Sequence, residues 1–406
     1  MRAHLKVRPY GGEKTQEDNM KILVLGSGII GAGAVRQLVK YSDAAVVNAD
    51  IDLAKAEAVA AKYGKDRVKA CRLDIDDHSG FVKFIKEENP DVVASTIGPF
   101  YRNAGKVYKA CIAAGKNCVD VCDDIDGVSQ AFAVNDEAKK AGITIVSGLG
   151  DSPGLTNILA KYCCDQLDSV EDINILWVAP LSEVGLAQYF HGIHCFAFPH
   201  QYVNGKLVDL DGRVTVEFGE PIGKIELLYC DHPEPFTLPR YIKGVKNVIC
   251  AGATWPEVPG LSMSAIAGFK DYLMQPVKVR GADVAPIEVL SHMAFNLVQQ
   301  QIEKWKVEGR EYRYGGTIIE VKGLKGGKKT RLLFSGVGKG MTTTPRTLVT
   351  VAKMVATGQV SVKGAYAAEG CIDPQDFMKA FSEGFATIKT MPGDKPDEFI
   401  VDIVPV

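Results

Sequence analysis

Long hydrophobic runs and a surplus of either charge are both missing from this sequence. No apolar stretch approaches the ~20 residues that a membrane-spanning helix needs. The 47 Lys and Arg residues against 49 Asp and Glu residues leave a formal net charge of −2. Without a basic surplus there is no electrostatic case for nucleic acid or an anionic membrane surface as a partner. We therefore expect a protein that acts on small molecules.

Residues 1–19 lack the apolar segment of a secretory signal. They are polar and contain four cations, and the first apolar strand pattern opens directly after them. We expect this stretch to be a disordered extension outside the fold.

Cysteine is not scarce, but its spacing lacks the repeated pairs of a zinc site. Among the ten cysteines, neither Cys118-x3-Cys122 nor Cys163–Cys164 is matched by a second pair at zinc spacing. Several others, such as Cys71, Cys111 and Cys250, lie in apolar stretches, where a free thiol behaves as a small hydrophobe. This usage is typical of a reduced, cytoplasmic protein.

One cluster does contain metal-ligand residue types. It consists of His191, His194, Cys195 and His200, and no Asp or Glu lies within it. We therefore interpret the cluster as polar lining of a substrate domain, and we predict no metal.

The composition is that of a globular protein with room for two domains. The chain has 406 residues, of which 46% are apolar and 24% charged.

The strongest motif is Lys21–Gly31, KILVLGSGIIG, in which an apolar run ends in Gly26-x-Gly28-x-x-Gly31 and leads into a helical pattern. Gly26 permits the tight turn, Gly28 lets the backbone approach a pyrophosphate, and Gly31 lets the helix pack closely on the strand. The pyrophosphate then lies at a helix N-terminus, where free N–H groups favour negative charge. Asp50 closes the next apolar run and can accept from ribose hydroxyls. These features predict a dinucleotide site.

The acidic residues also indicate which dinucleotide binds. Asp50 and Asp52 would repel a 2′-phosphate, and the nearest cation that follows is Lys55. We therefore predict NAD rather than NADP.

From residue 20 to 167, short apolar runs alternate with helical patterns. Strands separated by helices of 10–15 residues predict a Rossmann-like, doubly wound parallel sheet. The expected strands are Ile22–Leu25, Ala44–Ala49, Val68–Leu73, Val92–Thr96, Cys118–Val121 and Ile143–Ser147, and the expected helices are Gly31–Lys40, Leu53–Tyr63, Ser79–Glu88, Ala104–Ala114 and Ser129–Ala141.

Ligands of such sheets bind at the carboxyl ends of the strands. This rule selects Asp74, Ile97–Arg102, Asp120–Asp126 and Gly148–Gly154.

Beyond residue 167 the pattern changes to that of a mostly antiparallel sheet. Ser169–Trp177 and Lys224–Tyr229 read as strands, and Thr317–Gly336 reads as a hairpin. Pro345–Thr357 and Pro374–Ile388 return to a helical pattern. We expect an inserted α+β domain that shapes a substrate pocket or a dimer interface.

Two further motifs resemble known functional motifs but lack a feature that those motifs require. Tyr202-x3-Lys206 has the spacing of a short-chain reductase pair, but Asn204-Gly205 marks a turn where a helix would be required. Gly336–Met341 resembles a phosphate loop without its Lys-Ser/Thr ending.

Three blocks resemble the saccharopine dehydrogenase-like family, which includes lysine 6-dehydrogenases and carboxynorspermidine dehydrogenases. They are the N-terminal GSGIIG with ADIDLAKAE, the segment Gly148–Ala160, and the segment Thr342–Pro374. The middle, Leu181–Thr330, matches loosely, and His232–Arg240 is its most family-like string. Ala367-Ala368-Glu369 departs from the Pro-Glu pattern of the family.

The resemblance implies that C-terminal helices rejoin the dinucleotide domain. The expected domains are residues 20–155 plus 342–390 for the dinucleotide and residues 156–341 for substrate and dimerisation. It also implies NAD(P)-dependent hydride transfer at a C–N bond of an amine or amino acid, in a homodimer.

A general base is needed, because an amine must be neutral when its hydride leaves. The candidate catalytic residues are Asp120, His232 and Tyr101. Asp126 and Ser129 are expected to cap the following helix. Candidate substrate-binding residues are Arg240 and Arg102 for a carboxylate and Asp123 and Asp124 for an amine, and candidate cofactor-binding residues are Gly26, Ser27, Gly28, Ile29, Ile30, Gly31, Asp50, Asp74, Gly98, Pro99 and Gly154.

The leading function is that of an oxidoreductase resembling lysine 6-dehydrogenase. Saccharopine dehydrogenase ranks lower, because acidic pocket candidates suit an amine better than a tricarboxylate, and carboxynorspermidine chemistry stays open. From a different class, a dinucleotide-binding sensor without catalysis is the alternative. The sequence leaves open the substrate, the reaction direction, the identity of the base and the oligomer size.

Overall fold

A computed structural model describes residues 20–258, 261, 265–266, 268–310, 312–339, 342–382, 386–392 and 398–405. The predicted extension 1–19 lies outside these residues. Within them, no helix has the length and apolar character to cross a membrane.

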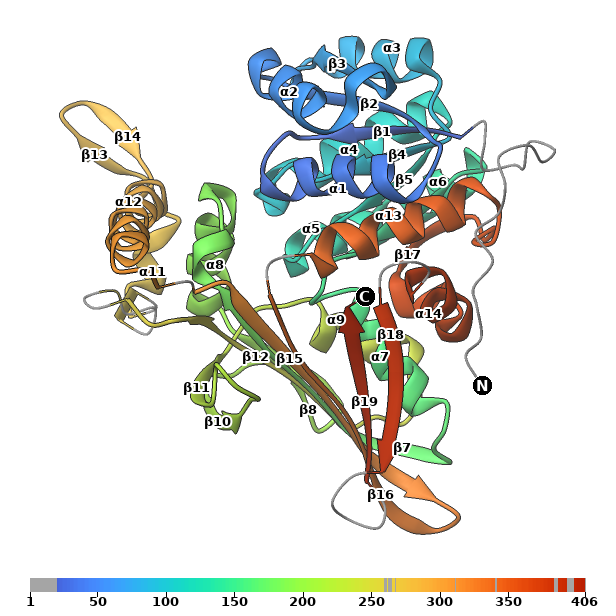
Figure 1. Ribbon diagram of the computed structural model, residues 1–406, viewed down its shortest axis with the longest axis vertical. Helices are drawn as coiled ribbons and strands as arrows, with labels where there is room; N and C mark the ends of the chain where they lie inside the picture. Colours follow the sequence, from blue (N-terminus) through green and yellow to red (C-terminus); the bar gives the residue numbers. More distant parts are fainter. Residues whose placement is uncertain are drawn as a thin grey trace.

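The first sheet is parallel throughout and has the order β17-β6-β5-β4-β1-β2-β3. The chain enters it at β1, next to both β2 and β4, so the strand order reverses direction there (Figure 1). This reversal is the point where doubly wound sheets bind ligands. The strands are β1 (Lys21–Leu25), β2 (Ala45–Asp50), β3 (Val68–Arg72), β4 (Val92–Ser95), β5 (Asn117–Asp120), β6 (Thr144–Ser147) and β17 (Gly364–Ala367).

Helices connect these strands and cover the sheet, as the alternating pattern predicts, so the doubly wound fold is confirmed. Their apolar faces are buried, whereas their polar faces remain in solvent. They are α1 (Ile29–Tyr41), α2 (Leu53–Val59) continued by the turns Ala60–Gly64 and Lys65–Arg67, α3 (His78–Glu88), α4 (Phe100–Ala114), α5 (Ile125–Ala133) and α6 (Asn135–Lys140). The next helix, α7 (Leu155–Cys164), leads from β6 to the second sheet and packs against it.

Two local expectations are wrong. The helix expected to begin at Ser129 begins at Ile125 and breaks at Val134, so neither Asp126 nor Ser129 caps its N-terminus. Asp124 takes the cap position, because its backbone is extended there. Pro374–Ile388 is helical only as α14 (Pro374–Ser382), and Ala386–Pro392 forms strand β18.

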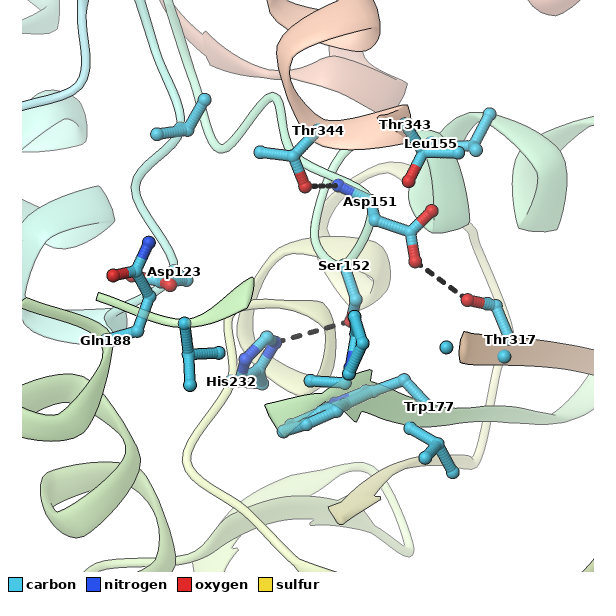
Figure 2. A pocket seen from close by; sticks show the side chains of 18 of the residues that line it. Asp123, Asp151, Ser152, Leu155, Trp177, Gln188, His232, Thr317, Thr343 and Thr344 are labelled. Carbon is cyan, nitrogen blue, oxygen red and sulfur yellow. Dashed lines mark hydrogen bonds between the residues drawn. The ribbon is translucent and has the colours of Figure 1, made fainter. Parts of the chain in front are cut away.

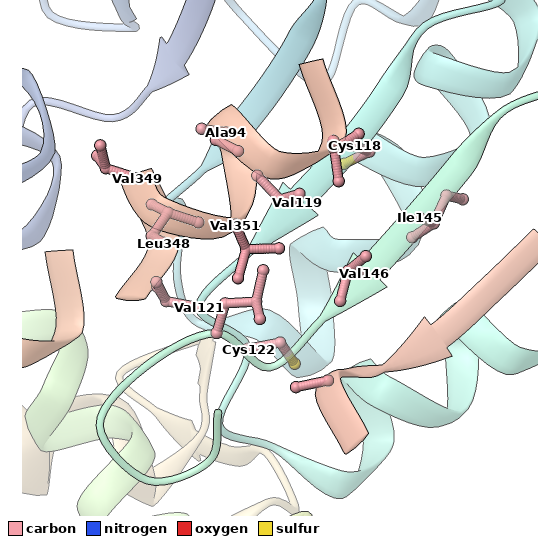
Figure 3. Packing of buried hydrophobic residues seen from close by; sticks show 14 of the residues in the cluster. Ala94, Cys118, Val119, Val121, Cys122, Ile145, Val146, Leu348, Val349 and Val351 are labelled. Atoms are coloured by element: carbon pink, nitrogen blue, oxygen red, sulfur yellow. The ribbon is translucent and has the colours of Figure 1, made fainter. Parts of the chain in front are cut away.

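Residues 343–367 return to the first sheet, whereas the chain from Ala386 on joins the second sheet, so the dinucleotide domain does not extend to the predicted residue 390. Helix α13 (Thr343–Ala356) packs across the first sheet, and β17 pairs with β6 at its edge. In Figure 3, Val351 of α13 lies beside the strand residues Val119 and Val146, and Leu348 and Val349 of the same helix belong to the same buried core. The sheet therefore buries this face only when the end of the chain is in place.

The second sheet is mixed, with the order β10-β11-β12-β7-β15-β16-β19-β18, and β8 joins β12 and β9. Most neighbouring pairs are antiparallel, as predicted, but β7 with β12 and β16 with β19 are parallel. The turn at Asn204-Gly205 joins β8 to β9, so Tyr202 and Lys206 lie on strands. The strands are β7 (Ser169–Pro180), β8 (His200–Val203), β9 (Lys206–Asp209), β10 (Arg213–Glu217), β11 (Lys224–Tyr229), β12 (Asn247–Trp255), β15 (Tyr314–Lys325), β16 (Lys328–Lys339), β18 and β19 (Glu398–Pro405).

Helices of the second domain bridge its sheet to the first domain and extend away from it. Figure 1 shows α8 beside the sheet, and α12 and the hairpin β13–β14 projecting outward. These elements are the turn Leu181–Glu183, α8 (Leu186–Ala197), α9 (Glu234–Tyr241), α11 (Lys270–Leu273), β13 (Val277–Val279), β14 (Ala282–Val284) and α12 (Pro286–Val307).

Candidate active site

The glycine turn after β1 has the geometry that the motif predicts. A Cβ atom added to Gly31 would lie 2.0 Å from the carbonyl oxygen of Gly26, so any side chain there would force α1 away from the turn. Gly26 has φ +96°, a backbone region that glycine adopts without strain. An added Cβ on Gly28 meets no atom within 4 Å. Gly28 therefore faces open space at the N-terminus of α1, where an anion is favoured.

Side chains of β2 hold the turn in place. The Oδ2 atom of Asp50 accepts from the backbone N–H of Ser27 at 2.7 Å. The buried amide of Asn48 donates to the carbonyl of Gly26 at 3.1 Å, and its oxygen accepts from the Ser27 hydroxyl at 2.9 Å. Asp50 thus lies at the end of β2 beside the turn, whereas Asp74 lies after the edge strand β3, where its carboxylate accepts from Asp76 N–H. Sequence reasoning missed Asn48, because an isolated polar residue in a strand has no motif.

A cavity of about 290 Å³ opens between this turn and the second domain. Its walls are mostly apolar and come from both domains. The dinucleotide domain contributes Ile30, Thr96, Gly98, Pro99, Val121, Asp123 and Gly150–Ser152, and the second domain contributes Trp177, Gln188, His191, His232 and Thr317, with Thr342–Thr344 closing one side.

Two histidines from different elements meet at the cavity wall. His191 lies on α8, which begins at Gly185 with the Gln188 side chain accepting from its N–H at 2.9 Å. His232 follows β11 and directly precedes Pro233, the N-cap residue of α9. Their Nε2 atoms are 3.3 Å apart. Both rings are buried and both line the cavity.

Carboxylates hold the outer nitrogens of both rings. Nδ1 of His191 lies 2.9 Å from Oδ1 of Asp124 and 3.4 Å from Oδ1 of Asp123. Nδ1 of His232 lies 3.1 Å from Oε2 of Glu234, a fully buried residue in the first turn of α9. A negative charge there is favoured by the helix dipole.

Burial by itself would lower the pKa of both imidazoles. The charges of Asp123 and Asp124 outweigh burial and raise the pKa of His191 well above its ordinary value. Glu234 does the same for the pKa of His232. In turn, the imidazoles outweigh burial and lower the pKa of Asp124 and Glu234, whereas burial raises the pKa of Asp123.

A third polar group lies at the end of β6, on the loop before α7. Figure 2 shows Asp151 and Ser152 on this loop, with His232 on one side of Ser152 and Thr317 beside Asp151. Asp151 accepts from the Thr317 hydroxyl at 2.7 Å. Burial raises the pKa of the Asp151 carboxyl. The hydroxyl of Ser152 contacts Nδ1 of His232 at 3.4 Å.

Asp120 lies elsewhere. It is 1% exposed and does not line the cavity. Its carboxylate accepts from the Tyr108 hydroxyl at 2.9 Å, from the Ser147 hydroxyl at 3.0 Å, and from the backbone N–H groups of Cys122 and Gly148 at 2.9 and 3.1 Å. Burial raises the pKa of this carboxyl. The arrangement ties the ends of β5 and β6 together and is that of a structural residue.

The remaining predicted residues flank the cavity without lining it. The Tyr101 ring stacks on His194 with centroids 5.0 Å apart, and its buried hydroxyl has no hydrogen-bond partner among the described residues. Arg102 pairs with Glu288 at 2.7 Å. Arg240 lies over the Phe132 ring, 4.4 Å from its centroid.

The structure divides the histidine and cysteine cluster of the sequence. His200 turns away and pairs with Asp231 at 2.7 Å. His191 reaches the cavity, and the acidic partners that the cluster lacks in sequence come from the distant loop after β5. His191, Glu234 and Asp151 are not among the predicted site residues. His191 lies in that cluster and Asp151 in the strand-end segment Gly148–Gly154, whereas Glu234 is marked only by its place in the family-like string His232–Arg240.

Two trios have ligand atoms within 4.8 Å of one another, a spacing that a metal also accepts: Asp123 with Asp124 and His191, and Glu234 with His232 and Cys250. Their shortest N···O distances, 2.9 and 3.1 Å, are below the ~3.3 Å that separates tetrahedral zinc ligands. Hydrogen bonding accounts for this geometry directly.

Comparison with known proteins agrees with the geometry. Residues 22–146 match the family described as saccharopine dehydrogenase NADP binding domain. A carboxynorspermidine synthase of Vibrio cholerae is 28% identical over 180 residues, which cover 38% of this chain and 43% of that protein. A carboxyaminopropylagmatine dehydrogenase of Synechocystis is 26% identical over 149 residues, 35% of this chain and 37% of that protein. The matches thus span less than half the length of these relatives.

The fold comparison extends further. Apo saccharopine dehydrogenase (L-Glu forming) from Saccharomyces cerevisiae superposes with a TM-score of 0.59, covering 90% of this chain and 97% of that chain at 17% identity. At this identity the likeness establishes the two-domain fold alone. Together with the family match, it confirms the resemblance read from the sequence: residues 22–146 are similar to the saccharopine dehydrogenase NADP binding domain, and the two-domain fold is that of a saccharopine dehydrogenase.

Proposed function

We propose that this protein is an NAD(P)-dependent dehydrogenase acting on the CH–NH group of a small amine or amino acid. One observation carries the proposal. A single cavity is lined by the start of α1 at Ile30, by Gly98 after β4, and by the buried pair His191 and His232. A hydride acceptor held by the glycine turn would therefore face a proton acceptor across one enclosed space.

The residues divide the reaction between them. When bound, the dinucleotide accepts the hydride from the carbon next to nitrogen. His232 takes the proton of the substrate ammonium, which leaves the neutral amine whose lone pair forms the C=N bond as the hydride departs. An alkylammonium thus becomes an iminium ion, with two electrons and one hydrogen passing to the acceptor and one proton passing to His232. Trp177 and the apolar wall exclude water from this step.

The charges of the cavity support a cationic substrate. Asp123 and Asp151 line it, and within the part of the wall that the structure describes no Lys or Arg does. The positive charge of the paired histidines is balanced by Asp124 and Glu234 behind them. Carboxylates attract an ammonium group and repel a tricarboxylate. We therefore propose a lysine 6-dehydrogenase-like activity ahead of that of a saccharopine dehydrogenase. Carboxynorspermidine-type chemistry is the second candidate, favoured by the relatives of that name.

The test is NADH or NADPH production at alkaline pH with lysine, saccharopine, diaminopimelate, ornithine and carboxynorspermidine. Turnover with lysine supports the leading proposal, and turnover with carboxynorspermidine alone moves the protein to the second. His232→Asn should lower turnover at least about a hundredfold with dinucleotide affinity unchanged. Dinucleotide binding without turnover of any substrate would instead indicate a sensor.

Within the dinucleotides, we propose a preference for NAD, although the family name favours NADP. Asp50 holds its carboxylate at the glycine turn, where it accepts ribose hydroxyls and repels a 2′-phosphate. Arg72 lies opposite Asp50 in the register of β3 on β2. It is the cation that would receive a 2′-phosphate if NADP were used instead.

We also propose a homodimer. Val289, Met293 and Leu297 recur every four residues along α12 and are exposed, which makes one apolar stripe on that helix. The neighbouring hairpin β13–β14 exposes Val277 and Val279, and an isolated hairpin is marginal without a covering surface. Met293→Glu should convert a dimer to a monomer in light scattering; a wild-type monomer would contradict the proposal.

A further inference from the structure

Every nitrogen of the His191–His232 pair has a partner within hydrogen-bond reach. The outer Nδ1 atoms face Asp124 at 2.9 Å and Glu234 at 3.1 Å, and the inner Nε2 atoms face each other at 3.3 Å. The number of protons on the pair therefore follows from which of these atoms are able to donate.

Both outer nitrogens carry a proton. Burial raises the pKa of Asp124 and Glu234, but the facing imidazoles lower it further, so that both side chains are ionised and only accept. The Ser152 hydroxyl beside Nδ1 of His232 donates its proton to Glu234 and has none left for the ring. Each Nδ1 must then be the donor in its contact.

The inner contact requires one proton. With none, two lone pairs would face each other, and with two, a pair of N–H groups would collide at 3.3 Å. The two rings together hold three protons and one positive charge. We infer that His191 and His232 form a single acid–base unit with one proton shared between their Nε2 atoms, in which His191 is a positioning residue that sets the protonation of His232.

The surroundings decide where the charge lies. His191 faces Asp123 and Asp124 from the loop after β5, the Cys195 thiol from its own helix and the Tyr101 phenol from α4. The shared proton belongs mainly to His191, which has two carboxylates within 3.4 Å.

His232 faces one carboxylate, that of Glu234, and the Cys250 thiol of β12. Of the two rings it therefore carries the smaller share of the single positive charge, and it is the one able to accept a further proton.

A direct count of protons tests this pairing without any substrate. In protein labelled with ¹⁵N-histidine, the two Nε2 nuclei should show a scalar coupling through one shared proton, and His191→Gln should abolish it. Two uncoupled Nε2 sites, each with its own proton or each with none, would overturn the inference.

A second test rests on the proposed function and reads the pH profile of kcat/KM. In the wild type, the imidazolium of His191, with ring centroids 5.2 Å apart, opposes protonation of His232. His191→Gln keeps a hydrogen-bonding group but removes this charge. The acid limb should then move to higher pH by about one to two units.

His200→Gln is the matched control, because His200 is also carboxylate-paired, at 2.7 Å, but contacts no second histidine. Its profile should stay in place. A His191→Gln profile that falls uniformly without moving would assign His191 a purely structural role. Failure to find any substrate would contradict the proposed function. The proton count by ¹⁵N labelling tests the histidine pair independently of that outcome.

Discussion

The glycine turn faces, across one cavity, the wall formed by Asp124, His191 and His232, which we call the histidine wall. The two regions differ in how far apart their residues lie in the sequence. At the turn, recognition comes from the backbone of consecutive residues, with Gly31 leaving 2.0 Å between an imagined Cβ and the Gly26 carbonyl. At the wall, function comes from side chains on three separate segments, with Asp124, His191 and His232 brought together by the fold.

This difference explains why the glycine turn could be predicted from the sequence and the histidine wall could not. A backbone constraint is local and restricts residue identity at fixed spacing. The histidine wall combines His191 with His232, 41 positions away, and with Asp124, 67 positions away, so no spacing rule connects them. Variants in each region test this difference.

The largest effect is expected at the turn. Gly31→Ala places a methyl group against the Gly26 carbonyl and should destabilise the fold by about 3 kcal/mol, with loss of dinucleotide binding. Gly28→Ala meets no atom within 4 Å and should keep stability while weakening dinucleotide binding. Thermal denaturation and NADH fluorescence separate the two. Equal stability of both variants would show that close helix packing does not govern this turn.

The next effect concerns Asp120, the base that the sequence pattern suggested. Asp120→Asn exchanges one acceptor oxygen for a donor beside the Tyr108 hydroxyl. We expect a loss of about 2 kcal/mol in the free energy of unfolding, with turnover within a few-fold of wild type. Urea denaturation and initial rates measure both. A hundredfold loss of turnover at full stability would instead return Asp120 to the chemistry.

Behind the histidine wall, a buried polar chain leads from Thr156 through Asn157 and Thr237 towards Glu369. Burial raises the pKa of Glu369 from 4.5 to about 6. Because the folded state binds this proton more tightly, the charged form costs stability, and the cost grows as pH rises from 4.5 through 6.

Glu369→Gln should therefore stabilise the protein at pH 8 by up to about 2 kcal/mol and change little near pH 4. Denaturant titrations at both pH values test this. A destabilised variant at pH 8 would mean that the charged carboxylate is needed there.

The smallest effect is expected at Asp50. Asp50→Ala removes the carboxylate that faces the ribose and should shift the NAD to NADP ratio of kcat/KM towards NADP about tenfold. Arg72→Ala in the same background should take that gain away, since Arg72 lies opposite Asp50. An unchanged ratio would show that Asp50 does not contact the ribose.

The first domain could be predicted almost strand by strand, because alternating apolar runs and helical patterns specify a parallel sheet. The hairpin from Tyr314 to Lys339 and the turn at Asn204-Gly205 were equally readable. Helix ends could not be predicted in the same way. At Ile125, for example, Asp124 takes the cap position with an extended backbone, although Asp126 and Ser129 are residue types that also cap helices.

The site was predicted in part. His232 was identified from its place in a proline-rich loop, and Asp123 from the carboxyl-end rule. Asp120 obeys the same rule, but it points back into the core, because strand-end position does not determine side-chain direction. The same rule selects the segment that holds Asp151, but not Asp151 within it, and no rule selects Glu234, since the contacts of both residues cross between domains.

The return of α13 and β17 to the first sheet has a consequence for synthesis. The strand at one edge of that sheet, and the helix packed against Val119 and Val146, emerge from the ribosome only after residues 169–339, which form most of the second domain. The nascent first domain therefore presents an open edge and an uncovered apolar face during most of translation. Chaperones have their longest opportunity to bind at that stage, and the emergence of α13 and β17, rather than completion of the glycine turn, sets when the dinucleotide domain closes.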